Sequence, residues 1–298
     1  MKSVLPTLAL AGTLPFSLAA CVVVDSQAHI TREEKRFTVA GTPELRLITF
    51  DGAIEIRSGE GKTIVVEIEK RGPTKEAVDE LKVESKQDGD RIEIEVKKPA
   101  HEIVFFGVGR MSPTASLIVT MPRDGNVVAR SGDGAIRIAH VHGRLELKTG
   151  DGSIRATDIG GQLTLATGDG SVTLEDVAGD LDVDTGDGSV SVAGKLATVK
   201  LHTGDGSITF RAAPGTAMKD DWSMTTGDGG VALYLPSDFG AELDAHTGDG
   251  SIRNEMDITT AGDVGRDRDR RTLRGKLGAG GKTLRIRTGD GSIRLKTS

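Results

Sequence analysis

The chain has 298 residues, which is long enough for one or two domains with a substantial core. Forty residues are glycine, only 3% are aromatic, and the formal net charge is −6. The scarcity of aromatic residues excludes a ring-rich core and indicates an interior of small and branched aliphatic side chains. The mildly acidic balance, with no basic stripe interleaved with aromatic residues, argues against a nucleic-acid-binding protein.

The chain begins with the features of a secretory signal peptide. Residues 1–20 combine the basic Lys2, an apolar stretch too short to span a membrane, and small residues before Cys21. The four residues LAAC at 18–21 resemble the lipobox of bacterial lipoproteins. This resemblance implies that Cys21 becomes a lipidated N-terminus and that residues 21–30 form a tether. Ordinary signal cleavage beside an incidental cysteine is the alternative.

Two further observations bear on this anchor. Cys21 is the only cysteine, so no disulfide partner competes with lipidation. Two or three acyl chains would hold the protein stably on a membrane. Val22 follows the cysteine where the pattern that retains lipoproteins at the inner membrane has aspartate. We therefore expect outer-membrane anchoring if the source is Gram-negative.

Residues 31–112 are predicted to form a β-rich N-terminal domain or cap. The segment TFDGAIEI at 49–56 looks like a degenerate first copy of the repeat that follows later in the chain. KEAVDELKVES at 75–85 suits a short helix or turn. QDGDRIEIEV at 87–96 is typical of a hairpin turn that leads into an alternating strand.

Residues 113–298 repeat a Gly-Asp-Gly motif at a constant interval. The central aspartates are evenly spaced at first and then continue beyond insertions: Asp133, Asp151, Asp169, Asp187, Asp205, then Asp228, Asp249 and Asp290. Apolar residues occupy the third, fifth, twelfth and fourteenth positions after an aspartate, and in three copies also the eighth. A spacing of two is strand periodicity, so each unit should contain two short strands and two turns.

This period predicts an all-β fold, a parallel β-helix or β-solenoid of about 18-residue coils, with the N-terminal cap at one end. Each coil should stack about 4.8 Å from the preceding one, and insertions should loop out while the strands keep their register. An antiparallel meander is the alternative. A membrane barrel is disfavoured, because it needs strands of about 9–11 residues and aromatic girdles, whereas the chain has one Trp and one Tyr.

Two segments interrupt this plan. Residues 101–113 (HEIVFFGVGRMSP) connect the cap to the repeats, and we expect Phe105 and Phe106 to plug the open core; an exposed binding element is the alternative. Residues 264–281 (VGRDRDRRTLRGKLGAGG) form a charged insertion in the final repeat. Uncapped strands invite pairing with other chains, so this insertion is expected to be a solvated flap over the last edge.

The motif itself has a structural explanation. Glycine on both sides of each aspartate would permit positive φ in a tight turn. The aspartate could close that turn by accepting backbone N–H bonds. Thr and Ser, which flank the motif, would form short hydrogen-bonding rows. Whether the row of aspartates also faces a partner stays open.

Three functional alternatives compete with that explanation. Calcium binding would need six to eight oxygens per ion, and one carboxylate per turn supplies too few unless adjacent coils contribute. Polysaccharide hydrolysis or lysis would need a specific pair of carboxylates in a groove. The residues that vary three positions before each aspartate are scattered instead: Lys148, Ala166, Asp184, His202, His246 and Arg287. Multivalent binding of a repetitive partner such as a glycan or protein could gain strength through avidity.

The stretch FTVAGTPELRLITFDGAIEI, the serial TGDGSI copies and the closing LRGKLGAGGKTLRIRTGDGSIRL resemble a bacterial domain-of-unknown-function family labelled "putative adhesin". The resemblance covers about residues 40–298. It implies solenoid-like β repeats, an extracytoplasmic location, a structural, adhesive or scaffolding role in the cell envelope, and an association with envelope stress. It supplies no catalytic residues and no cofactor. We therefore expect a non-enzymatic protein that partners the membrane through Cys21 and binds an envelope protein or glycan, with no nucleic acid.

Overall fold

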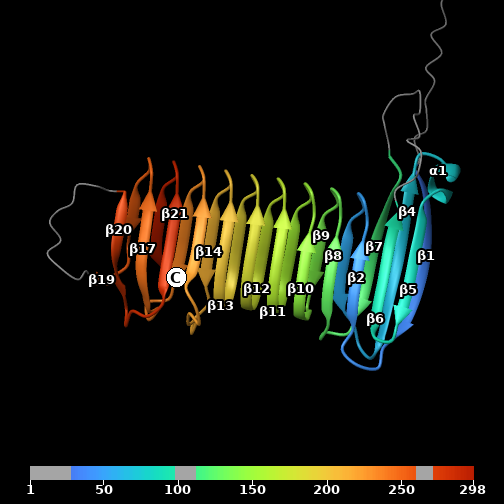
Figure 1. Cartoon of the computed structure of the whole chain (residues 1–298), viewed down its shortest axis with the longest axis horizontal. Helices are drawn as coiled ribbons and strands as arrows, with labels where there is room; N and C mark the ends of the chain where they lie inside the picture. Colours follow the sequence, from blue (N-terminus) through green and yellow to red (C-terminus); the bar gives the residue numbers. More distant parts are fainter. Residues whose placement is uncertain (1–27, 98–111, 260–270) are drawn as a thin grey trace, which may run out of the picture.

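The computed structural model describes residues 28–97, 112–259 and 271–298. In these segments the chain forms 22 strands and a single short helix, arranged side by side along one long axis (Figure 1). The predicted lipidation site Cys21, the aromatic pair Phe105 and Phe106, and residues 260–270 of the predicted charged insertion lie outside the described residues. No helix in the described part of the chain is long and apolar enough to cross a membrane.

The strands form two rows that face each other across the core. Row A holds the strands that lead into the Gly-Asp-Gly turns: β2 (Glu44–Ile48), β8 (Asn126–Arg130), β10 (His142–Lys148), the second halves of β11 (Ile154–Thr167), β12 (Val172–Thr185) and β13 (Val190–Thr203), then β15 (Trp222–Thr226), β21 (Thr283–Thr288) and β17 (Ala241–Thr247).

Row B holds the strands that follow those turns: β3 (Ile54–Ser58), β9 (Ile136–Ala139), the first halves of β11, β12 and β13, then β14 (Ile208–Ala212), β16 (Val231–Leu235), β22 (Ile293–Thr297) and β18 (Ile252–Asn254). Neighbouring strands within each row are parallel. The predicted solenoid is therefore confirmed, and the antiparallel meander is wrong for the repeats.

Strand alternation explains why these residues build the core. In β11, Ile154, Ala156, Leu163 and Leu165 point inward and are buried, while outward residues such as Arg155 are exposed. Equivalent residues stack between coils, as in the pairs Ile154↔Val172 and Leu165↔Val183. Repetition of this stacking produces one continuous core from Val39 to Leu295, which is largely aliphatic and includes the aromatic residues Phe210, Trp222 and Phe239. The apolar positions that the sequence predicts in each repeat are therefore the inward-facing ones.

The order of the coils departs from the predicted sequential stacking. Up to β16 each coil of the repeat region lies next to the coil that precedes it in the chain. The last coil in the chain, β21–β22, then lies between β15–β16 and β17–β18 instead of at the end. The coil of Asp249 is therefore the outermost one, although Asp290 comes later in the sequence.

The N-terminal end is closed by antiparallel strands. β1 (His29–Thr38) pairs with β4 (Thr63–Gly72), and β4 pairs with β7 (Thr114–Met121). The expected hairpin is present as β5 (Lys82–Asp88) and β6 (Arg91–Lys97), with Gly89 at positive φ in its turn. The expected helix is α1 (Lys75–Asp79), whose N-cap Thr74 accepts a hydrogen bond from the Ala77 amide.

At the other end, two short strands continue row A beyond β17. β20 (Thr272–Leu277) pairs with β17 on one side and with β19 (Ile258–Thr259) on the other. β20 lies within the segment 264–281 that the sequence suggests as a charged insertion. β20 therefore covers the outer edge of β17, which would otherwise be exposed.

Candidate functional site: the aspartate ridge

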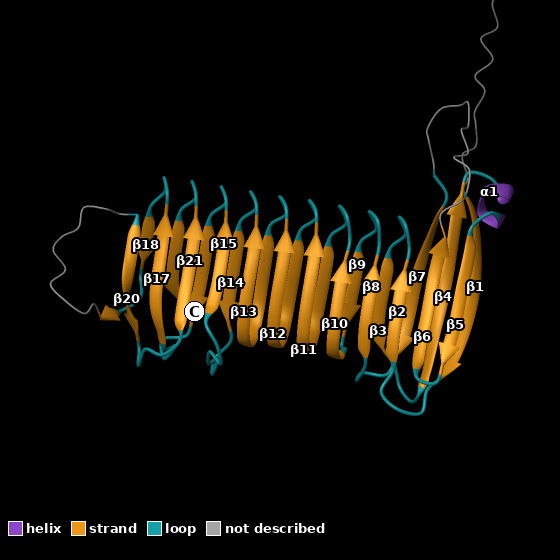
Figure 2. Cartoon of the chain, viewed as in Figure 1, coloured by secondary structure: helices purple, strands orange, loops and turns teal. Residues whose placement is uncertain are grey.

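The Gly-Asp-Gly turns follow one another along one long edge of the molecule, where Figure 2 shows a regular row of loops. Each turn is held from inside by a buried Thr, or Ser at position 131, two residues before the aspartate. In one turn, Thr203 Oγ1 lies 2.9 Å from the carbonyl oxygen of Gly188 in the neighbouring coil and accepts a hydrogen bond from the Gly206 amide at 3.2 Å. The hydroxyl thus closes its own turn and joins it to the next coil.

The glycines are required by close stacking of the coils. A Cβ atom on Gly170 would lie 2.0 Å from the carbonyl oxygen of Gly152 in the adjacent coil, a distance that no side chain can adopt. The second glycine of the other turns meets a similar backbone carbonyl. None of the glycines in these turns has positive φ. The expectation that glycine serves a left-handed conformation here is wrong, because the obstacle is the neighbouring coil.

The aspartates do not close the turns, so that expectation is also wrong. Within the described residues, no hydrogen bond or ion pair involves the carboxylate of any of them. Eight of the nine are exposed and Asp51 is half-buried. We call these nine side chains the aspartate ridge; in spatial order they are Asp51, Asp133, Asp151, Asp169, Asp187, Asp205, Asp228, Asp290 and Asp249.

Successive strands of a row are about 4.8 Å apart, so the aspartate ridge is a line of carboxylates at roughly that interval. Like charges on directly neighbouring strands repel one another. The fold gains no hydrogen bond from these charges and yet carries them in every turn. Such a line is suited to bind cationic groups spaced at the same interval.

The opposite edge carries a smaller polar cluster. His140, Asp158 and Asp176 occupy equivalent positions in three successive coils and have φ of 60°, 51° and 54°. His140 Nδ1 lies 2.8 Å and Arg123 Nη2 lies 2.9 Å from Asp158 Oδ2. The hydrogen bond with His140, followed by the charge of Arg123, holds the pKa of Asp158 below its usual value against a contribution from burial. The cluster is exposed and joins adjacent coils.

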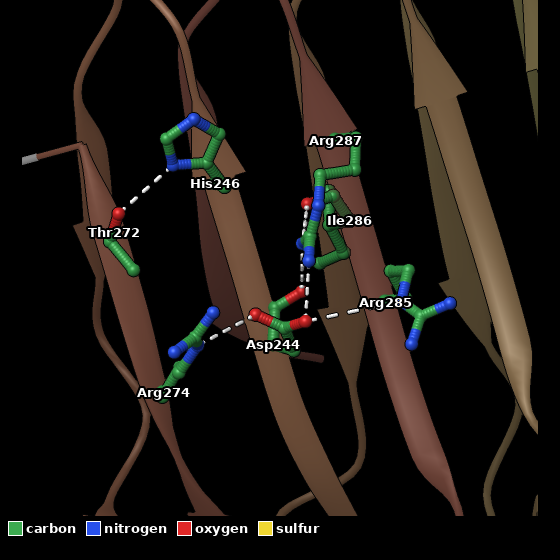
Figure 3. Close-up of polar contacts among 7 residues, drawn as sticks. All are labelled: Asp244, His246, Thr272, Arg274, Arg285, Ile286 and Arg287. Carbon is green, nitrogen blue, oxygen red and sulfur yellow. Dashed lines mark hydrogen bonds and ion pairs between the residues drawn. The ribbon is translucent and has the colours of Figure 1, made fainter.

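A second polar cluster joins three strands at the far end of row A (Figure 3). The half-buried carboxylate of Asp244 on β17 accepts hydrogen bonds from Arg274 on β20, at 3.1 Å, and from Arg287 on β21. Arg285 Nε lies 3.9 Å from the same carboxylate. Burial acts to raise the pKa of Asp244, but the hydrogen bonds from Arg287 and Arg274 outweigh it and hold the pKa below its usual value.

The Asp244 cluster is absent from the sequence predictions. The sequence contains one indication of it: the alternation Arg285-Ile-Arg287 places two arginines on the outward face of one strand. Asp244 lies far earlier in the chain, and sequential stacking would not place β21 beside β17. The cluster therefore becomes visible only with the observed coil order.

The alternative chemistries have little support in the geometry. Among the described residues, no group of three or more His, Cys, Asp or Glu side chains is placed to hold a metal ion. His202 and His246 are exposed on row A, and His246 Nδ1 lies 2.9 Å from the Thr272 hydroxyl. The two histidines are on strands separated by β15 and β21, so they do not form a joint site.

Three solved structures illustrate what the chain is similar to. A putative cell adhesion protein from Clostridium sporogenes matches with 13% identity over 90% of this chain and 100% of that one, at a TM-score of 0.27. Putative adhesins from Parabacteroides merdae and Parabacteroides distasonis match with 13% and 12% identity, over 89% of this chain and 95% and 97% of theirs, at TM-scores of 0.34 and 0.37. No curated protein sequence matches the chain.

A family model matches most of the chain. The model of the Toastrack family, DUF4097, matches residues 44–296, from the start of β2 nearly to the end of β22. This range contains every turn of the aspartate ridge and both rows of strands. The resemblance to a domain-of-unknown-function family that the sequence motifs suggest is confirmed: the chain belongs to the Toastrack DUF4097 family.

Proposed function

We propose that this protein is a lipid-anchored protein of the cell envelope that has an adhesive or scaffolding role and binds its partner through the aspartate ridge. The observation that carries the proposal is that the fold makes no use of nine repeated carboxylates. Buried threonines close the turns, and the glycines permit the coils to stack, so turn formation does not account for the aspartates. A role in binding accounts for them, and no catalytic step is required.

The chemistry of the aspartate ridge defines the partner. A line of carboxylates about 4.8 Å apart favours a partner that presents amino or guanidinium groups repeatedly, on an envelope protein or an amine-bearing glycan. Each contact would be weak, because exposed ion pairs contribute little in water. Several contacts made at once on a rigid scaffold would raise the overall affinity through avidity. Divalent cations that bridge neighbouring carboxylates are the second candidate, since a divalent ion would neutralise adjacent turns.

A lipid anchor at Cys21 would hold the aspartate ridge near a membrane surface. Lipidation of Cys21 would hold residue 28, where the described chain begins, within about 25 Å of the membrane surface. The solenoid would then extend the aspartate ridge along or away from that surface. In a Gram-negative source the expected location is the outer membrane. A link to envelope stress would follow if the partner becomes accessible only when the envelope is damaged.

The proposal is tested by binding to isolated cell envelopes. The full chain is compared with the triple variant Asp151→Asn, Asp169→Asn, Asp187→Asn, which removes three adjacent ridge charges. The matched control is Glu175→Gln, Asp182→Asn, Asp184→Asn, which removes three exposed charges of β12, within one coil and away from the ridge. We expect the ridge variant to lose at least tenfold in apparent affinity and the control to keep it.

Added salt and added chelator distinguish binding to cationic groups of a partner from bridging by divalent cations. Binding to cationic groups should weaken as ionic strength rises and should not respond to a chelator. Cation bridging should disappear with the chelator and return with added calcium. Equal binding by the wild type, the ridge variant and the control would refute a role for the aspartate ridge.

A further inference from the structure

The last coil of the chain occupies a slot between two coils that precede it in sequence. We call residues 283–298 the inserted coil, and the slot is the space between β15–β16 on one side and β17–β18 on the other. Leu284 on β21 pairs with Trp222 and with Leu243, one on each side. Ile293 on β22 pairs in the same way with Val231 and Ile252.

Without the inserted coil, both sides of the slot would be open strand edges. Within the described residues, β17 and β18 have no strand pairing with β15 or β16. Edge strands present unpaired N–H and C=O groups that recruit another strand. The strands on both sides also carry inward apolar residues of the core, namely Trp222, Met224, Leu243 and Ala245. The slot therefore offers two strand edges with which a strand pair can bond.

The contacts that hold the inserted coil depend on its own sequence. Thr288 Oγ1 lies 2.8 Å from the Gly229 carbonyl on one side, and on the other side Thr247 Oγ1 lies 2.7 Å from the Gly291 carbonyl. The Thr283 amide donates to Asp221 Oδ1 at 2.8 Å, and Arg287 bonds to Asp244. A second copy of the chain carries every one of these groups.

The connection to the inserted coil is short and rich in glycine. β20 ends at Leu277 on the outer side of β17, and β21 begins at Thr283 on its inner side. The five residues between them include Gly278, Gly280 and Gly281, with φ of 49°, 77° and 133°. Fully extended, five residues span roughly 17 Å, which is enough to pass two or three neighbouring strands at about 4.8 Å each.

From these observations we infer that two copies of the protein can exchange their inserted coils, each coil filling the slot of the other copy. The exchanged dimer keeps the strand pairings of the inserted coil and its side-chain contacts with the slot, and changes only the conformation of residues 278–282. Domain swapping has a low energetic cost for this reason. The C-terminal end of the solenoid is thus an interface whose partner is a second copy of the same chain.

Cross-linking between chains tests the exchange. Ser223 and Arg285 are Cα partners on neighbouring strands β15 and β21, a separation of about 4.8 Å that suits a disulfide. Full chains carrying Cys21→Ser with Ser223→Cys are mixed with full chains carrying Cys21→Ser with Arg285→Cys. The mixture is unfolded, refolded at high concentration and oxidised. A single chain with both new cysteines shows that the geometry allows the bond.

The control pair is Asp182→Cys with Lys200→Cys, which are Cα partners on β12 and β13 in consecutive coils. We expect at least tenfold more disulfide-linked dimer for the slot pair than for the control pair on a non-reducing gel. Absence of the cross-linked dimer, while the doubly substituted chain forms its internal disulfide, would overturn the inference. Equal cross-linking of both pairs would overturn it too, because it would indicate unspecific association.

Discussion

Within each turn, threonine and aspartate have separate tasks. The buried hydroxyl satisfies backbone groups of two coils, while the carboxylate two residues later points to solvent. Sequence alone assigns the turn-closing bond to aspartate, since aspartate commonly closes turns. That assignment fails because the inward or outward direction of residues around a corner depends on how coils stack. The spacing of the aliphatic residues along the strands has no such ambiguity, and its prediction is confirmed.

Substitutions within one turn separate these tasks. Thr203→Val keeps the shape of the side chain but leaves the bonds to Gly188 and Gly206 unmade, and it should cost about 1–3 kcal/mol of unfolding free energy. Asp205→Asn in the same turn should leave stability unchanged, or raise it at low ionic strength, because it removes a repelling charge. Urea unfolding midpoints give the comparison. A loss for Asp205→Asn as large as that for Thr203→Val would restore the turn-closing role to aspartate.

Among the elements, β17, β20 and β21 are joined by charge as well as by backbone pairing. Asp244 lies between Arg274 and Arg287, which come from strands on either side of it. Three strands converge on one carboxylate whose side chain is 22% exposed. Removal of the charge would leave the arginines facing one another without their common partner.

This cluster should make the C-terminal end sensitive to acid. The pKa of Asp244 is lowered in the folded protein, while an unfolded aspartate titrates near pH 3.9. Its contribution to stability is therefore fully present above about pH 4 and is lost as the pH falls through the lower folded value. Asp244→Asn should cost about 1 kcal/mol at neutral pH, as expected for a partly accessible ion pair.

Unfolding midpoints of the wild type and Asp244→Asn measure the effect across pH. The difference should be largest near pH 7 and should shrink below about pH 4. Glu242→Gln, an exposed neighbour on the same strand that has no ion pair within the described residues, serves as the control. A difference between wild type and Asp244→Asn that stays constant from about pH 7 to about pH 3 would contradict the assignment.

Sequence reasoning recovers these elements but not their order. The offsets from each aspartate place Trp222, Leu243 and Leu284 at equivalent positions, and their pairing confirms this. Equivalence does not say which coil is the neighbour of which, because all coils present the same apolar pattern. The order depends on the connections between β16 and β17 and between β20 and β21. Nothing in the periodicity encodes those connections.

At the scale of the whole molecule, the protein is an elongated rod with an exchangeable end and an expected anchor. Antiparallel strands flank both ends of row A and the N-terminal end of row B. Lipidation at Cys21 stays a prediction from the sequence. It would attach the rod to a membrane by its N-terminal end and would place the cap nearest the lipid.

Labelling with a fatty acid tests the anchor directly. Radiolabelled palmitate should be incorporated into the wild-type chain, which should fractionate with membranes. Cys21→Ala should take up no label and should leave the membrane fraction, since a signal peptide gives no lasting attachment once cleaved. Ser26→Ala, a substitution in the same tether that leaves the cysteine in place, is the matched control and should be labelled like the wild type. Label in the Cys21→Ala protein would refute the lipoprotein assignment.

The position of the inserted coil also affects how the protein folds during its synthesis. Chains emerge and begin to fold from their N-terminal side, so residues 241–277 are made before the strands that join them to the rest of the two rows. For that interval the nascent protein carries a loose flap and two open edges. Only arrival of residues 283–297 between them completes the core. The rod can therefore be complete only after residues 283–297 have been synthesised. A chain whose synthesis stops earlier would expose the open strand edges to any chaperone or protease that recognises them.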